Sequence, residues 1–320
     1  MTTIGLLTSG GDAPGMNAAI RAVVRTAIEN GIKVLGIKNG FKGLMYGDTV
    51  EMDLRSVSNI INRGGTILHS ARSEEFLTIE GQKKAADMCK HLEIESLIII
   101  GGDGSFRAAR EFLKFGITCV CIPGTIDNDI SCTDYTIGYD TAMNTVMEMA
   151  DKVRDTTESH SRCSVIEVMG RDAGFIALNS GVAVGATSIL VPEIEYDFDK
   201  DVIERMKKTL RTGKRHFVVI VAEGCGKATQ MAKEIQEKTG IETRATILGH
   251  VQRGGSPTVR DRVLASRMGN FAVHHVLESK ESCVVAAKSE EIVSYGIEES
   301  ANMTKLLDLE LYRLAYEISI

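Results

Sequence analysis

The chain has 320 residues, of which 43% are hydrophobic and 25% are charged, as is ordinary for a globular protein of one large or two smaller α/β domains. Its formal net charge of −6 leaves no basic surplus, which argues against nucleic acid as a partner. No apolar run approaches the length of a membrane-spanning helix, and the first residues, MTTIGLLTS, lack the basic and long apolar regions of a signal peptide.

The cysteines indicate the compartment in which the chain works. There are seven of them, and no two form a C-x-x-C pair, so free thiols are favoured over a disulfide framework or a zinc site. Free thiols are typical of a reducing environment. We therefore predict a cytoplasmic protein that binds neither membrane nor nucleic acid.

The first predicted elements are a strand over 4–8 and a helix over 16–30, with the glycine loop SGGDAPG at 9–15 between them. A loop of this kind points backbone N–H groups and a helix N-terminus at a phosphate, although glycines also make plain tight turns. A strand over 33–38 follows, so the unit is βαβ and right-handed.

A second strand, glycine loop and helix follow the same plan. Residues 40–75 are expected to be irregular, and a helix is predicted over 80–91. A buried strand over 96–100 then leads through GGDGS at 101–105 into a helix over 106–115. Asp103 is a candidate Mg²⁺ ligand because that ion prefers hard oxygen donors, the alternative being a helix N-cap. Two phosphate-type loops in one sheet indicate a nucleotide.

The segment 122–129, IPGTIDND, is a rigid turn that carries two carboxylates. It follows a short buried strand predicted over 118–122, so Asp127 and Asp129 are expected at the ligand side of an open sheet. Two residues apart in extended chain, they point the same way, and like charges so close require a cation such as Mg²⁺ or an arginine between them. The alternative is an Asx-rich surface turn.

The second half of the chain continues the alternation of strands and helices. Strands are predicted over 164–169, 188–191, 217–222 and 243–248, and helices over 140–154, 200–211, 230–238 and 260–277, before a final short strand and C-terminal helix. Polar residues follow several strands, among them Arg171, Glu223 and His250. We therefore predict an α/β fold with two doubly wound, Rossmann-like domains, mainly parallel sheets and an active cleft between the domains.

Five of these motifs, in this order, closely resemble the bacterial ATP-dependent 6-phosphofructokinases, and the likeness covers essentially the whole chain. One such motif could arise by chance, but five in order do not. They are TSGGDAPGMN at 8–17, GGDGS at 101–105, PGTIDND at 123–129, MGR at 169–171 and GHVQRGGSP at 249–257.

The resemblance implies transfer of the ATP γ-phosphoryl group to the 1-hydroxyl of fructose 6-phosphate, the committed step of glycolysis. It implies that Asp127 is the base, that Thr125 and Arg171 hold the transferring group, and that Arg72 bridges donor and acceptor phosphates. Mg²⁺ would be organised by Asp103, with Asp129 as a helper through water. The ATP positions implied are Gly11, Arg72, Ser73, Gly102, Asp103, Gly104 and Ser105.

The resemblance also implies how substrate and subunits are arranged. Residues 1–138 with 251–305 would bind ATP, and residues 139–250 with 306–320 would bind fructose 6-phosphate. Arg162 and Arg244 match residues that reach in from a neighbouring subunit, so a homotetramer with shared active sites is expected. The substrate positions implied are Thr125, Ile126, Asp127, Arg162, Met169, Gly170, Arg171, Glu223, Arg244, His250, Val251, Gln252 and Arg253.

Two glycines indicate the phosphoryl donor. Relatives that use pyrophosphate carry Asp where this chain has Gly104 and Lys where it has Gly124. Those side chains would fill the space that the α-phosphate and nucleoside of ATP need. We therefore expect both glycines to leave room, and the donor to be ATP.

The resemblance implies an allosteric site for ADP and phosphoenolpyruvate, but the chain departs from the family pattern there. Thr187 stands where relatives have Glu, and Thr212 where they have Arg, although Arg211 is adjacent. We therefore expect effector control to be weak or altered. The effector positions implied are Arg21, Arg25, Arg154, Gly185, Thr187, Thr212, Lys214, Arg215 and His216.

Two other functions are compatible with glycine loops of this kind. One is a kinase for another acceptor, such as NAD or a lipid, and the other is a non-catalytic nucleotide sensor. Intact Asp103, Asp127 and Arg171 argue against a sensor, because a protein that only binds nucleotide need not keep a base.

Overall fold

The computed structural model describes residues 2–279 and 281–319, and the chain divides into two compact units. Unit 1 comprises Met1–Thr141 and Arg253–Lys305, and unit 2 comprises Ala142–Gln252 and Leu306–Ile320. Each unit is built on its own mainly parallel sheet, which confirms the predicted α/β class. The ligand that each unit binds stays a prediction. None of the described helices is long and apolar enough to cross a membrane.

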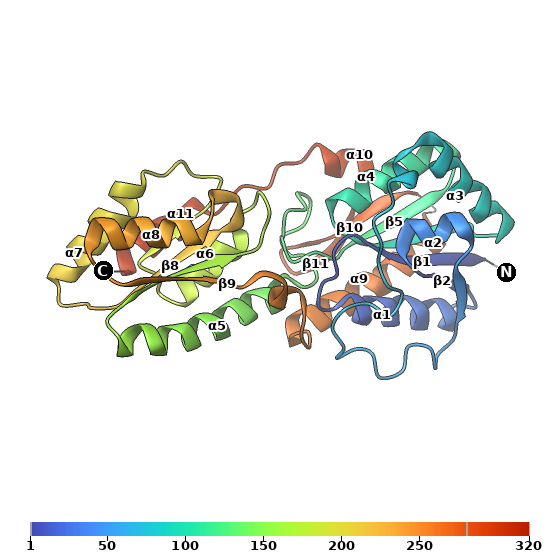
Figure 1. The fold of residues 1–320 in the computed structure, drawn as a ribbon. Coiled ribbons are helices and arrows are strands. Elements are labelled where there is room, and N and C mark those ends of the chain that lie inside the picture. The colour runs from blue at the N-terminus through green and yellow to red at the C-terminus, as the bar shows by residue number, and fades with distance from the viewer. Residues whose placement is uncertain (1, 280, 320) are drawn as a thin grey trace. The chain divides into compact units, whose positions relative to one another are not determined.

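The described strands of unit 1 form one seven-stranded sheet (Figure 1). They are β1 (Thr3–Ser9), β2 (Lys33–Ile37), β3 (Thr49–Met52), β4 (Ser96–Gly101), β5 (Thr118–Pro123), β10 (Cys283–Lys288) and β11 (Glu291–Gly296). Their order is β11-β10-β5-β4-β1-β2-β3, and only the edge strands β3 and β11 are antiparallel to their neighbours. β1 and β4 are buried along their whole length, as strands covered on both faces must be.

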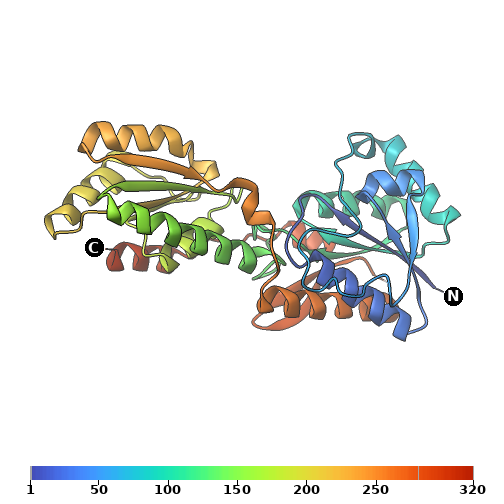
Figure 2. The same ribbon diagram turned by 60° about the horizontal axis from the view of Figure 1, so that its bottom comes forward.

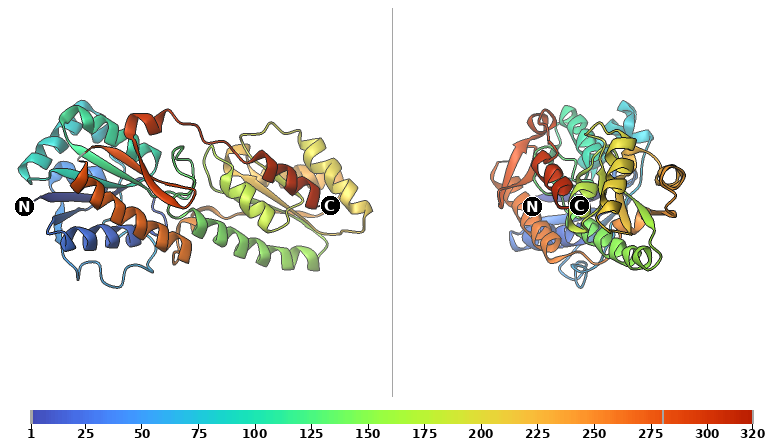
Figure 3. Two further views of the ribbon diagram at one scale, coloured as in Figure 1. Left: turned by 180° about the vertical axis from the view of Figure 1, so that it is seen from behind. Right: turned by 90° about the vertical axis from the view of Figure 1, so that its left-hand side faces the viewer.

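Helices cover both faces of this sheet. They are α1 (Met16–Glu29), α2 (Gly40–Tyr46), α3 (Ile79–His91), α4 (Asp103–Phe112), α9 (Val259–Glu278) and α10 (Ile297–Ala301). α1 and α9 pack against each other on one face, and α2, α3 and α4 lie on the other (Figure 3). Short 3₁₀ turns lie at Glu75–Leu77, before α3, and at Leu113–Phe115, after α4.

The prediction of irregular backbone over 40–75 is wrong at its start, where α2 and β3 form. Two glycines in the first turns of α2 lower its helix propensity, which hid it from the pattern. Gly43 is required, because a Cβ there would lie 1.7 Å from the carbonyl oxygen of Lys38. Burial of Phe41, Leu44 and Met45 stabilises the helix instead. The ring of Phe41 stacks on that of Phe76, with 4.2 Å between the ring centroids.

The described strands of unit 2 form a parallel four-stranded sheet in the order β7-β8-β6-β9. They are β6 (Cys163–Val168), β7 (Ser188–Leu190), β8 (Phe217–Ala222) and β9 (Thr243–Ile247). Its helices are α5 (Tyr139–Ser159, which begins in unit 1), α6 (Phe175–Ala183), α7 (Arg205–Arg211, after a π-helical turn at Asp199–Glu204), α8 (Ala228–Thr239) and α11 (Leu309–Ile318). Figure 2 shows α8 and α5 on opposite sides of the sheet.

The sequence pattern missed α6 and one strand of the C-terminal hairpin. α6 has the sequence FIALNSGVA, with too few polar residues to show a helical period, and most of it is buried. The final segment holds two strands, β10 and β11, where one was expected. Helix α4 begins at Asp103, three residues earlier than predicted, which places Asp103 in its first turn.

A buried carboxylate joins the start of α5 to α9. Asp261 is fully buried and accepts hydrogen bonds from the backbone N–H groups of Gly138 (2.9 Å) and Thr141 (2.8 Å). It therefore satisfies donors that the first turn of a helix leaves without partners.

Replacing this carboxylate should destabilise the fold. In Asp261→Asn an amide NH₂ would face a backbone donor, so the free energy of unfolding in urea at pH 7 should fall by about 1–3 kcal/mol. Asp308→Asn, at the exposed N-cap of α11, should cost only a few tenths of a kcal/mol, because Asn caps as well as Asp. Equal urea midpoints for Asp261→Asn and wild type would show that the Asp261 carboxylate does not stabilise the fold.

The same group predicts a pH dependence. Burial raises the pKa of Asp261 from 3.8 to about 6, although bonds from Thr141 and Gly138 oppose the shift. Between these two values the folded state binds a proton that the unfolded state has released. The proton-linked part of the stability is therefore full below about pH 4 and is lost as the pH rises through 6, whereas the hydrogen bonds that the ionised carboxylate accepts remain at pH 7. Urea midpoints of wild type and Asp261→Asn, compared across this window, measure it.

Candidate active site

Three loops of unit 1 meet at one edge of its sheet, where the parallel strands β1, β4 and β5 end. In the parallel register Ser9 pairs with Gly101, and Gly101 pairs with Pro123, so the ends of β1, β4 and β5 are level. From β1 the chain runs through α1 to β2 on one side, and from β4 it runs through α4 to β5 on the other. The boundary between β1 and β4 is therefore a topological switch point, where open α/β sheets bind ligands.

The first loop, after β1, is held in place from two directions. Ser70 Oγ donates to the carbonyl oxygen of Gly10 at 2.5 Å, and Arg253 Nη1 donates to that of Asp12 at 3.2 Å. A Cβ on Gly11 would lie 2.2 Å from Arg253 Nη1, so the guanidinium needs glycine there. The loop at 66–73 thus brings Arg72, which is exposed, to the same edge of the sheet.

Asn17, the last residue of the motif at 8–17, has a supporting role that the sequence did not predict. It is buried at the start of α1, and its Nδ2 donates to the carbonyl oxygens of Arg63 (3.0 Å) and Gly64 (3.1 Å). Its Oδ1 accepts from the N–H of Ile67 at 2.8 Å. An Asn among the apolar residues of a helix was the signal for such a structural role.

The second loop places Asp103 in the first turn of α4. The N-cap residue is Gly102 and no side chain caps the helix, so the N-cap alternative for Asp103 is wrong. Its carboxylate instead forms an ion pair with Arg107, one turn along α4. Ser105 is buried, and Gly102 approaches Thr125 of the third loop so closely that a Cβ would lie 3.4 Å from its Cβ.

The third loop is buried, which excludes the surface-turn alternative. Thr125 is 6% exposed, Ile126 0% and Asp127 3%, and the N–H of Asp127 donates to Thr125 Oγ1 at 3.2 Å. Asp129 is half-buried and lines, with Asp103 and Arg107, a cavity of about 80 Å³. Two carboxylates from two different loops therefore face one space.

This donor set fits Mg²⁺ better than a metal held wholly by protein. Among the described residues no group of three or more His, Cys, Asp or Glu side chains could hold a metal ion. Mg²⁺ commonly takes one or two carboxylates and completes its octahedron with water and phosphate oxygens. Asp103 and Asp129 supply such a pair.

The two glycines that indicated ATP differ in their surroundings. A Cβ on Gly104 would meet nothing within 4 Å, as expected. The same expectation is wrong for Gly124, whose Cβ would lie 3.0 Å from Ile100 Cγ2 and 3.3 Å from Met16 Cε. Only Gly104 borders open space, because the apolar side chains of β4 and α1 already cover Gly124.

A second group of predicted residues lies at the ends of β6 and β8 in unit 2. Glu223 Oε1 accepts from the N–H groups of Gly170 (3.1 Å) and Arg171 (2.7 Å). Arg171 has a positive φ of 54° and Gly170 one of 140°, conformations that this carboxylate helps to hold. The Arg171 side chain is exposed.

Gln252 holds the neighbouring loop together. It is fully buried, accepts from the N–H of Met169 at 3.2 Å and donates to the carbonyl oxygen of Gly249 at 3.0 Å. The geometry makes it a support for the 3₁₀ turn Gly249–Arg253, whereas His250 and Val251 of that turn are exposed.

Arg162 and Arg244 lie at the opposite edge of the same sheet, where the parallel strands β6 and β9 begin. Arg162 precedes β6, Arg244 is the second residue of β9, and Ser164 pairs with Arg244 in the register. Both guanidinium groups contact the carboxylate of Glu242, at 2.7 and 2.6 Å. A six-residue strand, roughly 20 Å long, separates this edge from Met169 and Glu223. Within unit 2 the fold therefore does not bring these arginines to Met169 and Glu223.

The predicted effector positions are divided between the units. Arg21 and Arg25 lie on α1 in unit 1, whereas Arg154, Thr187, Lys214 and their neighbours belong to unit 2. Burial, together with the charges of Arg154 and Arg205, lowers the pKa of Lys214. The buried Nε and Nη2 of Arg154 and Oγ1 of Thr187 form no hydrogen bond with any described residue. Arg154, Arg205 and Lys214 thus form a partly buried cluster of positive charge.

Comparison with known proteins agrees with this geometry. A profile of the phosphofructokinase family matches residues 3–276. The chain is 56% identical over 319 residues to an ATP-dependent 6-phosphofructokinase of Clostridium tetani, and equally to one of Clostridium botulinum strain Loch Maree, with full coverage of both chains in each case.

Solved structures show the same fold. A phosphofructokinase from Saccharomyces cerevisiae superposes with a TM-score of 0.89 at 33% identity, covering all of this chain and 48% of the yeast chain. A pyrophosphate-dependent phosphofructokinase from Marinobacter aquaeolei superposes with a TM-score of 0.86 at 22% identity, covering 97% of this chain and 86% of the Marinobacter chain. At this identity the match shows only that the fold is shared. The chain therefore belongs to the phosphofructokinase family.

Proposed function

We propose that the chain is a kinase that transfers the γ-phosphoryl group of ATP to the 1-hydroxyl of fructose 6-phosphate and yields ADP and fructose 1,6-bisphosphate. The observation that carries the proposal is the buried Asp127 loop beside the glycine loop of Asp103, at the switch point of the sheet. Full-length identity of 56% to an ATP-dependent 6-phosphofructokinase supports the same reaction.

Asp127 would act as the base. It accepts the proton of the sugar hydroxyl as that oxygen bonds to the γ-phosphorus, while the bond from phosphorus to the β-phosphate oxygen breaks and ADP leaves. Phosphoryl transfer has a loose transition state, so a rigid, well-placed carboxylate matters more than covalent participation. Burial of the 125–128 segment, whose members are at most 6% exposed, supports this role.

Mg²⁺ would be held by Asp103, with Asp129 as a second carboxylate, and the phosphate oxygens of ATP would complete its shell. Bound there, the ion would neutralise charge that builds up on the phosphates. Arg107 forms an ion pair with the carboxylate of Asp103, which places positive charge beside it.

Two arginines and a threonine would hold the transferring group. Arg72 and Arg171 are exposed guanidinium groups on loops that hydrogen bonds hold, and a planar guanidinium can bridge two phosphate oxygens. Thr125 would donate its hydroxyl. Glu223 supports this assignment because it fixes the backbone from which Arg171 projects.

A second copy of the chain would complete the sugar site. Arg162 and Arg244 lie at the far edge of the unit 2 sheet from Met169, Glu223 and His250, so they would grip the 6-phosphate bound to a neighbouring chain. We propose that the chain forms a homotetramer with shared sites. The positive cluster of Arg154 and Lys214 would take the phosphate of an effector such as ADP or phosphoenolpyruvate.

A coupled ADP-release assay tests the proposal. With Mg²⁺, we expect ADP release with ATP and fructose 6-phosphate, and ADP release slower by at least about two orders of magnitude with other sugar phosphates. Pyrophosphate yields orthophosphate and no ADP, so its use as donor is measured by the formation of fructose 1,6-bisphosphate, which should be slower by a similar factor. ADP release with NAD or a lipid instead of the sugar would favour the other kinase. ATP binding without ADP release would favour the nucleotide sensor.

A further inference from the structure

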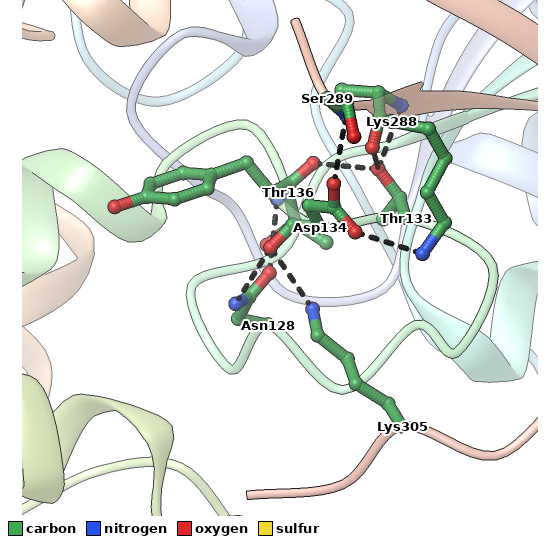
Figure 4. Close-up of polar contacts among 9 residues, drawn as sticks. Asn128, Thr133, Asp134, Thr136, Lys288, Ser289 and Lys305 are labelled. Carbon is green, nitrogen blue, oxygen red and sulfur yellow. Dashed lines mark hydrogen bonds and ion pairs between the residues drawn. The ribbon is translucent and has the colours of Figure 1, made fainter. Parts of the chain in front are cut away.

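The loop 124–137 carries the two carboxylates of the proposed site and is held at both ends by groups that the proposed mechanism does not use. Figure 4 shows the contacts around Asn128 and Asp134. Near the sheet, Gly124 pairs with Ile137 in a parallel bridge, and the N–H of Ile137 donates to the carbonyl oxygen of Pro123 at 2.9 Å. The loop therefore leaves β5 and returns to it as a closed unit.

Inside the loop, Asn128 links the segment that carries the two carboxylates to the returning segment, residues 134–136. It is 3% exposed with a positive φ of 53°, its Oδ1 accepts from the N–H of Thr136 at 3.1 Å, and its Nδ2 donates to the carbonyl oxygen of Asp134 at 3.2 Å. Thr136 Oγ1 in turn donates to the carbonyl oxygen of Thr125 at 2.6 Å. Asn128 stands between Asp127 and Asp129, so its two bonds set the backbone from which both carboxylates project.

The far end of the loop is bound to β10. That strand pairs with β5 only at Cys283 and Val284 and then runs on past it. Beyond this point the N–H of Asp134 donates to the carbonyl oxygen of Ala287 at 2.9 Å, and the N–H of Ala287 donates to Thr133 Oγ1 at 2.9 Å. Residues 133–134 thus replace β5 as the neighbour of β10.

The carboxylate of Asp134 secures this contact. It accepts from Lys288 Nζ at 2.7 Å and from the backbone N–H of Ser289 at 3.0 Å. Burial alone would raise the pKa of Asp134, but these two bonds outweigh burial and lower it, so the carboxylate is ionised at neutral pH.

The turn that presents these donors is unusual in sequence. Ser289 and Glu290, which connect β10 and β11, have positive φ values of 47° and 71°. Two-residue hairpin turns with two positive φ values normally take Asn-Gly, and other residues keep that conformation only where their surroundings determine it. The bond from Ser289 N–H to Asp134 is one such determinant.

The segment that leaves unit 1 reaches the same point. Lys305 is the last residue of unit 1, and its Nζ donates to the carbonyl oxygen of Asp134 at 3.2 Å, the atom that also accepts from Asn128. Asp134 therefore collects contacts from the carboxylate loop, from the β10–β11 hairpin and from the connection to unit 2.

We propose that Asp134 is a positioning residue for phosphoryl transfer, which rests on the proposed function for the reaction itself. Its carboxylate, bound by Lys288 and Ser289, holds residues 133–134 on β10. We call this contact of Asp134 with Lys288 and Ser289 the anchor. Through Asn128 the anchor fixes the positions of Asp127 and Asp129. The Asp134–Lys288 pair is partly exposed, with side chains 49% and 38% accessible, so it contributes little to global stability and its removal leaves the fold intact.

The test removes the anchor from either side, with Lys288→Met and Asp134→Asn. In each, kcat should fall about three- to tenfold, as for the loss of one hydrogen bond, while the KM for ATP stays within about twofold. Amide hydrogen exchange of residues 124–137 should quicken, with little change in Tm. Lys33→Met is the matched control, because Lys33 forms a similarly exposed pair with Glu51 in unit 1, on β2 and β3, and should change none of these readouts.

Two conservative changes separate the anchor from a merely structural role. Lys288→Arg keeps the charge and should keep kcat within about twofold of wild type. Ser289→Asn with Glu290→Gly keeps the backbone donor and suits the turn, so Tm should rise while kcat stays unchanged. Unchanged kcat in both Lys288→Met and Asp134→Asn would overturn the proposal, even if exchange quickened.

The exchange measurement distinguishes failure of this proposal from failure of the proposed function, because it needs no substrate. Quicker exchange of 124–137 in the two variants, together with a wild type that phosphorylates no sugar phosphate, would overturn the function and support the anchor. Normal exchange in the variants of an active enzyme would overturn the anchor alone.

Discussion

Asp127→Asn is expected to lower kcat for fructose 6-phosphate by about 10²–10⁴-fold, the usual contribution of a positioned base. Asn has nearly the volume of Asp, and the site of Asp127 is only 3% exposed, so the loop should keep its packing. The affinity for ATP should stay within about threefold, because the nucleotide is assigned to the glycine loops. Single-turnover ADP formation and ATP titration measure the two quantities separately.

The control for this variant is Asp129→Asn, two residues away on the same loop. Asp129 is assigned to the metal, so its loss should raise the Mg²⁺ concentration needed for half-maximal rate, and saturating Mg²⁺ should recover much of kcat. No Mg²⁺ concentration should recover Asp127→Asn. A rate near wild type in Asp127→Asn would remove the base from the mechanism.

The second large effect concerns the arginines at the far edge of the unit 2 sheet. Arg162→Ala and Arg244→Ala should each raise the KM for fructose 6-phosphate about 10–100-fold, because each loses a charge-assisted hydrogen bond to the phosphate. The KM for ATP should be unchanged. Arg313→Ala, an exposed arginine on α11 of the same unit, is the control and should leave both constants unchanged.

Co-expression of two impaired chains then tests whether the site is shared, when activity is measured at a fructose 6-phosphate concentration far below the raised KM of Arg162→Ala. A chain with Arg162→Ala keeps its base, and a chain with Asp127→Asn keeps its arginine. In a randomly mixed oligomer about a quarter of the sites would combine an intact Asp127 with an intact Arg162, because each partner is correct half the time. Activity near that fraction of wild type supports shared sites. Mixtures with no more activity than the separate variants would show that each chain serves its own site.

Much of the fold could be read from local pattern. Buried strands such as β4 and β8 are continuous apolar runs, and their bounds agree with prediction to within a residue. The glycine loops stood out because turns with positive φ or close backbone contacts select glycine at Gly10 and Gly101. α2 and α6 were missed because tertiary burial, not an amphipathic period, stabilises them.

The residues of the candidate site were visible in the sequence as motifs, whereas the contacts that support them were not. Asp127 and Asp103 lie in dense, unusual clusters of Gly, Asp and Pro. Asn17 and Gln252 also lie in motifs, but their supporting roles could not be read from them, and Asp134 lies outside any motif. Each acts on a segment more than five residues away in the chain. Only folding brings such partners together.

By itself the sequence determined the class of fold, the phosphate loops and the carboxylates, because glycine, proline and paired Asp residues have few physical reasons to recur in that order. The tertiary structure alone decided which of these groups meet. Register between β1, β4 and β5 aligns three loops at one edge, while the length of β6 and β9 keeps Arg162 and Arg244 at the other edge of their sheet. Distances of this kind depend on strand pairing between distant segments, which no local pattern encodes.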